Sequence, residues 1–225
     1  MTITTTTLTR AAAVAAVLGG LAYVLIQFIH PADVIESLST QAWVNVHILS
    51  FAEAILALIG VTGIYLYQSP KVGLVGLTGY LMFGLFFILQ ASFNFAEALI
   101  APLIAVSAPQ LAVDFVGLFG RYPAETDLGA LAALPTVGAI LYVVGAILLG
   151  IVTIRARLLS RGAAVLLIVA AAVTPLAALL PHALERMAAV PMGFALVWLG
   201  YSLWMNSRTN ASHPALVDSD RIAAS

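Results

Sequence analysis

The sequence predicts an all-α integral membrane protein with six transmembrane helices, and two observations carry this prediction. The chain of 225 residues is 62% hydrophobic and only 8% charged, whereas soluble domains carry about 25% charged residues. The apolar residues also form runs of about 20 residues or more, the length that crosses a hydrocarbon layer about 30 Å thick. The lipid bilayer is therefore the first expected partner.

The six candidate spans together form one domain, residues 1–206. They cover residues 11–29, 42–67, 72–104, 128–154, 162–180 and 187–205. The first run exceeds the 7–15 apolar residues typical of a signal peptide and no clear cleavage site follows it, so we expect it to be retained. The third run is too long for one simple span and is interrupted by Glu97 and Pro102, which predicts a tilted helix or one that overshoots the bilayer.

Basic residues near the span ends predict the orientation, because cytoplasmic loops carry an excess of Lys and Arg. With the N-terminus in the cytoplasm, the outer loops hold only Arg121 and Arg186. The cytoplasmic side then holds the other seven: Arg10, Lys71, Arg155, Arg157, Arg161, Arg208 and Arg221. Both termini are thus predicted to be cytoplasmic, in a multi-pass protein of the bacterial plasma (inner) membrane.

Two segments outside the spans also carry a prediction. In the outer loop 107–127, Leu111, Phe115 and Phe119 could share one helical face, which predicts a short helix at the membrane interface. The C-terminal residues 207–225 are polar and without period, so we expect a disordered cytoplasmic tail.

Composition excludes several classes of function. A net charge of −1 leaves no basic surface for nucleic acid. The chain has no cysteine, which removes disulfides, thiolate metal sites, iron–sulfur clusters and cysteine nucleophiles. Small residues at four-residue steps, such as Ala12, Ala16 and Gly20, predict close packing between helices. A second copy of the chain is a further candidate partner.

Glu53 is the most informative polar residue of the sequence. It lies about 15 Å along the second span from Trp43 by helix rise, close to the middle of the hydrocarbon layer. A charge at that depth costs about 2.5–3.5 kcal/mol on insertion scales. Glu53 must therefore be neutral, be paired, or face a hydrated cavity.

Three neighbouring spans each carry a polar stripe in their outer half. The first has Tyr23, Gln27 and His30, the second has Asn45, His47, Ser50 and Glu53, and the third has Gln90, Asn94 and Glu97. Lipid cannot solvate these groups, so we expect the stripes to face one another around an outward-facing polar pocket. Phe86 and Phe87 would supply apolar walls. A purely structural polar network is the competing interpretation.

The pocket suits a membrane-embedded enzyme that acts on a lipophilic, isoprenoid-like substrate by acid–base chemistry of the isomerase or cyclase type. A buried carboxylic acid is a good proton donor, so Glu53 is expected to be the acid, with His47 and Glu97 positioning it or accepting the proton. The substrate would be bound by Tyr23, Gln27, Asn45, Ser50, Gln90, Asn94, Phe86 and Phe87. This chemistry needs no cofactor.

Two other classes of function remain open from the sequence. His30, His47 and His182 could bind a divalent metal or haem in a redox protein. Glu53 and Glu97 could instead relay protons in a small transporter, although an inverted repeat is not evident. A non-catalytic subunit of a membrane complex belongs to the same third class.

Overall fold

The computed structural model describes residues 3–119, 124–177 and 186–212, and these residues form helices joined by short connections. The helices are α1 (Thr5–Ile29), α2 (Ile35–Leu38), α3 (Gln41–Leu99), α4 (Ala101–Ser107), α5 (Pro109–Val116), α6 (Leu134–Ala156), α7 (Arg161–Ala177) and α9 (Val190–Ser212), with 3-10 turns at Gly117–Phe119, Gly129–Ala133 and Arg186–Ala189. No strand occurs within the described ranges.

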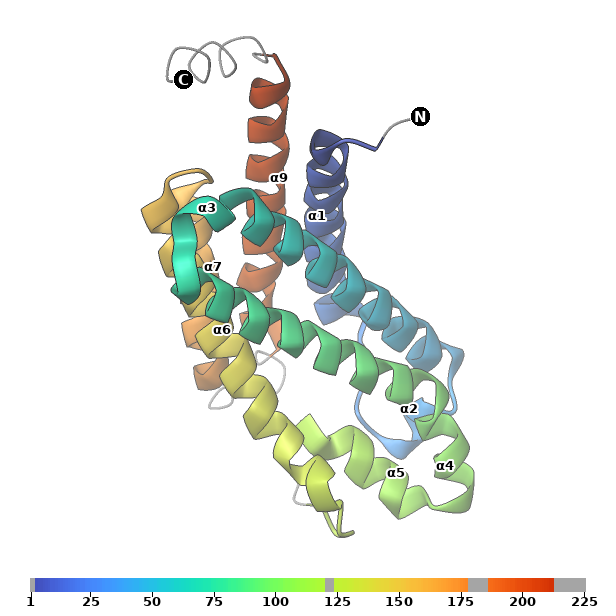
Figure 1. The fold of residues 1–225 in the computed structure, drawn as a ribbon. Coiled ribbons are helices and arrows are strands. Elements are labelled where there is room, and N and C mark those ends of the chain that lie inside the picture. Colours follow the sequence, from blue (N-terminus) through green and yellow to red (C-terminus); the bar gives the residue numbers. More distant parts are fainter. Residues whose placement is uncertain (1–2, 120–123, 178–185, 213–225) are drawn as a thin grey trace, which may run out of the picture.

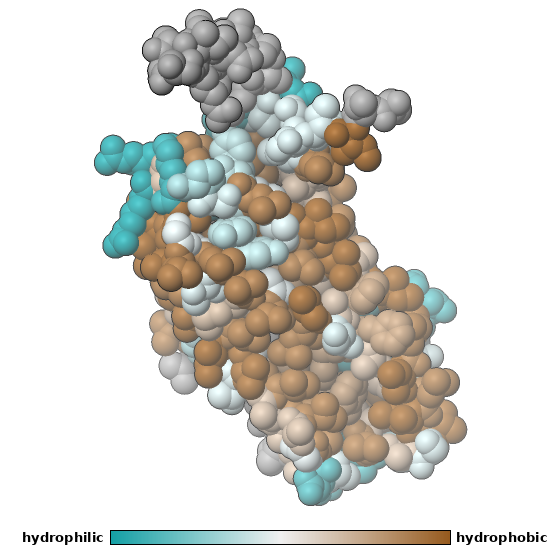
Figure 2. Space-filling view, in the orientation of Figure 1, coloured by the Kyte–Doolittle hydropathy of each residue, from teal (hydrophilic) through white to brown (hydrophobic). Residues whose placement is uncertain are grey.

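The predicted class, an all-helical membrane protein, is confirmed. Four helical stretches are long and apolar enough to cross a membrane: Thr5–Ile29, Gln41–Leu99, Gly129–Ala156 and Arg186–Arg208. Figure 2 shows hydrophobic residues covering most of the visible face, with hydrophilic residues gathered toward its ends. Such a surface favours a lipid environment, because water-soluble proteins rarely expose large continuous apolar patches.

Helix α1 begins earlier than expected, at Thr5 rather than at Ala11, because its first turn is capped. The Thr4 hydroxyl accepts a hydrogen bond from the Thr7 backbone N–H at 3.2 Å, which satisfies one of the free donors of the first turn. The helix ends at Ile29, as predicted. His30 follows in an extended conformation before Pro31, a residue that disfavours helical geometry in the position preceding it.

The second and third predicted spans are joined in one 59-residue helix, α3, which bends at Gly73. The helix continues through residues 68–71, where the sequence suggested a connecting loop. At Gly73 the backbone takes φ 53° and ψ −156°. The chain reverses there, so that the second half of α3 runs back in the opposite direction to the first half (Figure 1). The second half ends at Leu99 rather than at residue 104, and α4 begins at Ala101 with proline in its first turn.

Gly73→Ala is expected to destabilise the folded protein by about 1–3 kcal/mol, because L-residues pay this cost for a strained positive-φ conformation. A β-carbon at Gly73 would meet no atom within 4 Å, so steric crowding does not contribute. Gly117→Ala is the matched control, since that site is equally open but has φ −75°. Thermal unfolding in detergent should separate the two variants; equal melting temperatures would contradict the assigned bend.

The long helices form a ring of neighbouring contacts, and α3 also touches α9. Helix α1 packs against α9 and α3, α6 packs against α3 and α7, and α7 returns to α9. The predicted small-residue packing is confirmed: a β-carbon on Gly60 would lie 2.6 Å from Ala16, and one on Gly20 would lie 2.5 Å from the Gly193 carbonyl oxygen. The first half of α3 is thus held directly against α1, which sets the distance between two of the polar stripes.

The outer segment contains the expected short helix, α5, followed by the 3-10 turn at Gly117–Phe119. Phe115 and Phe119 both pack on Phe93, with ring centroids 4.9 and 4.8 Å away. Asp114 holds the segment that follows, because its carboxylate accepts hydrogen bonds from the Thr126 hydroxyl at 2.6 Å and the Thr126 backbone N–H at 2.7 Å. These bonds keep the pKa of Asp114 below its usual range. Asp114 is therefore a structural anchor.

The ends of the last two predicted spans are only partly described. Helix α7 covers Arg161–Ala177, and residues 178–180 of the expected span 162–180 lie outside the described part of the chain. Helix α9 continues to Ser212, into the stretch where a tail was expected, while the remainder of that tail, 213–225, is likewise outside the described ranges. The first turn of α1 and the last turn of α9 lie at the same end of the ring (Figure 1).

Candidate functional site

A polar cavity of about 180 Å³ lies where α1 meets both halves of α3 and the turn that precedes α9. It is lined by Tyr23, Ile26, Gln27, His30, Ser50, Glu53, Gln90, Asn94, Arg186 and Ala189. Residues from each of the three polar stripes therefore face the same space, as the sequence predicts. The bend at Gly73 makes this possible, because it brings Gln90 and Asn94 back beside Ser50 and Glu53.

Glu53 is fully buried and is only half satisfied. Its side chain is 0% exposed, and its Oε2 atom accepts a hydrogen bond of 2.7 Å from the Gln90 side-chain amide. Its Oε1 atom has no hydrogen-bond partner among the described residues. Burying a polar atom without a partner costs free energy, so this oxygen is arranged to meet a proton, a water molecule or a ligand in the cavity.

The other polar side chains around Glu53 direct their donors to the backbone of their own helices. The Gln27 amide donates to the Tyr23 carbonyl at 3.0 Å, the Ser50 hydroxyl to the Val46 carbonyl at 3.0 Å, and the Asn94 amide to the Gln90 carbonyl at 2.8 Å. These bonds fix the side chains in place. Each amide uses one of its two N–H donors in this way.

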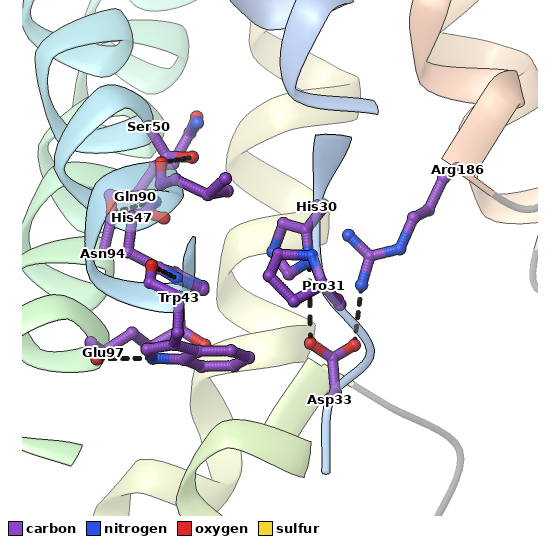
Figure 3. A network of polar contacts seen from close by, with 11 residues as sticks. His30, Pro31, Asp33, Trp43, His47, Ser50, Gln90, Asn94, Glu97 and Arg186 are labelled. Atoms are coloured by element: carbon purple, nitrogen blue, oxygen red, sulfur yellow. Dashed lines mark hydrogen bonds and ion pairs between the residues drawn. The ribbon is translucent and has the colours of Figure 1, made fainter. Parts of the chain in front are cut away.

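His30, Asp33 and Arg186 form a second group of contacts at the end of α1 (Figure 3). One Arg186 guanidinium nitrogen lies 2.7 Å from Asp33 Oδ2. The His30 ring donates from Nδ1 to the Pro31 carbonyl at 2.7 Å and lies 3.9 Å from the other Asp33 oxygen. Burial, and then the nearby Arg186 cation, lower the pKa of His30. The imidazole is therefore neutral at pH 7.

Of the predicted catalytic set Glu53, His47 and Glu97, Glu53 alone lines the cavity. His47 and Glu97 are both buried, but neither lines the cavity. They meet each other beside it, where His47 Nε2 lies 3.4 Å from Glu97 Oε2. The His47 ring packs on Trp43, with centroids 4.1 Å apart, and the Trp43 indole N–H donates to the Glu97 backbone carbonyl at 2.8 Å.

His47 Nε2 has no hydrogen-bond partner among the described residues, although Glu97 Oε2 lies 3.4 Å away. His47 Nδ1 donates to the Trp43 carbonyl at 2.8 Å, so in a neutral ring Nε2 carries a lone pair. A carboxylate oxygen facing that lone pair would place two acceptors against each other. The arrangement is satisfied when Glu97 is protonated and donates to Nε2, or when the ring carries a second proton and pairs with the carboxylate.

Three predicted binding residues lie elsewhere. Phe86 and Phe87 pack with Phe83 and Tyr142 in an aromatic cluster, with neighbouring centroids 4.8–6.3 Å apart, and do not wall the cavity. Asn45 accepts a hydrogen bond from Gln41 at 2.8 Å on the exposed side of α3. The angular position of a residue predicts which face of a helix it lies on. A helix face is broad, however, so some residues on it do not line the cavity.

Sequence reasoning missed two contributions to the site. Arg186 and Asp33 pair across 153 positions of the chain, and their only signal in the sequence was a shared location in the predicted outer loops. Tyr142 on α6 interacts electrostatically with Tyr23, and its hydroxyl lies 3.2 Å from the Thr174 hydroxyl of α7. These contacts tie the cavity wall to helices that carry none of the three stripes.

The metal alternative has few candidate ligands in the structure. No group of three or more metal-binding side chains occurs among the described residues, and His182 lies outside them. The His30 and His47 rings contact each other directly, with centroids 4.9 Å apart and an edge-to-face angle of 75°. That contact leaves no space for a haem between the two rings.

Comparison of the chain with models of known protein families, with curated proteins and with solved structures finds no match. The geometry of the cavity and the chemistry of its lining side chains are therefore the guide to function.

Proposed function

We propose that this protein is a membrane-embedded enzyme that acts on a lipophilic substrate by acid–base chemistry, with Glu53 as the proton donor. The observation that carries the proposal is the Glu53 carboxyl group, fully buried at the cavity wall with one oxygen held by Gln90 and the other free of any described partner. A proton on Oε1 would point this acid at whatever enters the cavity.

The setting of Glu53 favours the neutral acid. Ionised carboxylates in the hydrocarbon region are costly without a cation, and the nearest described cation on the cavity, Arg186, already pairs with Asp33 at 2.7 Å. The Gln90 amide donates a single hydrogen bond to Oε2, which suits the carbonyl oxygen of a protonated carboxyl group. Isomerisation or cyclisation of an unsaturated lipid uses such a proton and returns it, so atoms balance without a further reactant.

The size of the cavity limits what part of a substrate it holds. A volume of about 180 Å³ is smaller than the roughly 300–1,000 Å³ of pockets that enclose a drug-sized ligand. The cavity therefore suits the reactive end of a lipophilic molecule, whose remaining chain would stay outside it.

An enzyme is favoured over a proton relay because the two turns of α3 that directly follow Glu53, residues 54–61, carry no polar side chain. The next residues on the same side of the helix are Ala57 and Val61, which are buried in the apolar core. A transporter or a relay needs access from both faces of the membrane. A site reached from one end suits a reaction in which the proton stays within the pocket.

We further propose that the chain crosses the bacterial plasma membrane six times, with both termini in the cytoplasm. This count takes the two halves of α3 as separate crossings and includes α7, which has 17 residues. The start of α1 and the end of α9 at one end of the ring (Figure 1) support an even number of crossings. The basic residues near the span ends support the orientation.

The test compares the lipids of cells that express the wild-type chain or Glu53→Gln, by untargeted chromatography and mass spectrometry. We expect a species of unchanged mass but shifted retention in wild-type cells, and its loss in Glu53→Gln, because an amide is not an acid. Glu36→Gln, an exposed site on α2, is the control and should behave as wild type. Identical lipid profiles from wild type and a folded Glu53→Gln variant would refute the proposed function.

A further inference from the structure

We infer that the cavity recognises the hydroxyl group of a neutral lipophilic alcohol, rather than a phosphorylated or otherwise anionic lipid. This inference rests on the proposed function, because it names the class of substrate for the same site. It follows from the hydrogen-bonding groups beside Glu53, from the charge balance at the end of α1, and from the volume of the cavity.

Two buried oxygen atoms, Glu53 Oε1 and Gln90 Oε1, lack hydrogen-bond partners within the described chain. They belong to side chains that already contact each other through Gln90 Nε2 and Glu53 Oε2 at 2.7 Å. The Gln90 oxygen can only accept a hydrogen bond, and the protonated Glu53 oxygen donates one. A single group that accepts from Glu53 and donates to Gln90 would satisfy both atoms.

A hydroxyl group satisfies both requirements with one oxygen atom. An ether or ester accepts but cannot donate, so it leaves Gln90 Oε1 unsatisfied. A carboxylate or phosphate also only accepts, and it brings a negative charge toward the Gln90 and Glu53 oxygens. An ammonium group donates but cannot accept from a protonated Glu53. Alcohols are therefore the lipid class whose head matches this pair.

The charges of the residues that line the cavity disfavour an anionic ligand. Arg186 is the cation among the described residues that line the cavity, and its guanidinium is paired with Asp33 at 2.7 Å. His30 is the other basic lining group, and burial lowers its pKa, so it supplies no positive charge at pH 7. A phosphate or diphosphate would enter without a free counterion, and the desolvation of such an anion is costly.

The volume of the cavity limits which part of a ligand it can hold. The cavity holds about 180 Å³, enough for a hydroxyl group and its first carbons but too little for a sugar-phosphate head together with a chain. Ile26 supplies an apolar side chain within this polar lining, as the carbon beside the hydroxyl requires. The ligand should therefore be a long-chain alcohol whose tail extends out of the cavity.

The test measures thermal stabilisation of the purified full-length protein in detergent by three probes: geranylgeraniol, its methyl ether and geranylgeranyl diphosphate. We expect saturable stabilisation by the alcohol, and binding at least about tenfold weaker for the ether and the diphosphate, because a site built for a hydroxyl rejects analogues that lack it. Equal binding of alcohol and ether, or tighter binding of the diphosphate, would overturn the inference.

Gln90→Leu should abolish the preference for the alcohol over the ether, whereas Gln41→Leu, an exposed glutamine on the same helix, should preserve it. A preference retained in Gln90→Leu would contradict the assigned acceptor. If Gln90→Leu does not fold, the comparison of the three probes on the wild-type protein still tests whether the cavity prefers an alcohol. If the alcohol binds but wild-type and Glu53→Gln cells have the same lipid profile, only the proposed enzyme is refuted. If the two lipid profiles differ but the alcohol does not bind, only this inference is refuted.

Discussion

Gly145→Ala is expected to destabilise the protein by about 3 kcal/mol, the upper end of the usual cost of overpacking a well-packed core. A β-carbon at Gly145 would lie 2.5 Å from the Phe83 backbone nitrogen and 2.9 Å from the Phe83 Cα atom. Both are backbone atoms of α3, so no side-chain rotation can relieve the contact, and α6 must move away from α3. For a chain of this size the melting temperature should fall by roughly 6–12 °C.

Gly138→Ala is the matched control, because Gly138 lies on the same helix and is also buried. A β-carbon there would first meet the tip of Leu89 at 3.6 Å, an ordinary van der Waals contact. Its melting temperature should stay close to that of wild type. A displaced α6 also moves Tyr142, which interacts with Tyr23 in the cavity wall. Equal stability of the two variants would show that α3 and α6 do not approach as closely as described.

His47→Phe is expected to destabilise the protein by about 1–3 kcal/mol, the cost of a buried polar group that loses its partner. Phenylalanine fills a similar volume beside Trp43, but it leaves the buried Glu97 carboxyl without the nitrogen that lies 3.4 Å away. Glu97→Leu should have a comparable cost, because it strands His47 Nε2. The double variant should be less destabilised than the sum of the two single variants, by at least about 0.5 kcal/mol, in thermal unfolding.

Glu97→Gln separates the two arrangements of the shared proton. Its side-chain amide can donate to His47 Nε2 as a protonated Glu97 would, so the melting temperature should remain near that of wild type if Glu97 is neutral. If the pair were a buried ion pair, removal of one charge would instead cost about 3–5 kcal/mol. Additive effects of His47→Phe and Glu97→Leu would contradict a direct contact between the two side chains.

The parts of the candidate site that depend on the depth or helical spacing of individual residues were predictable. Glu53 stands out because a carboxyl group deep in an apolar run needs a proton, a partner or a cavity. The polar stripes of the first and third spans, which include His30 and Asn94, were predicted by the same reasoning. The pairing of His47 with Glu97 was not predictable, because both lie on the expected faces and only the rotation and depth of the two halves of α3 decide which groups meet.

The sequence by itself determined the class of the protein and the helices that carry its polar residues. Apolar runs with few charges require a membrane, and a turn of 3.6 residues places Ser50 beside Glu53 whatever the rest of the chain does. Only the tertiary structure decided that α3 continues to Gly73 before it bends, and that Gln90, rather than His47, meets Glu53. The physical reason is that periodicity is local, whereas the partners of a buried group depend on helix distances set by contacts such as those of Gly60 and Gly145, far apart along the chain.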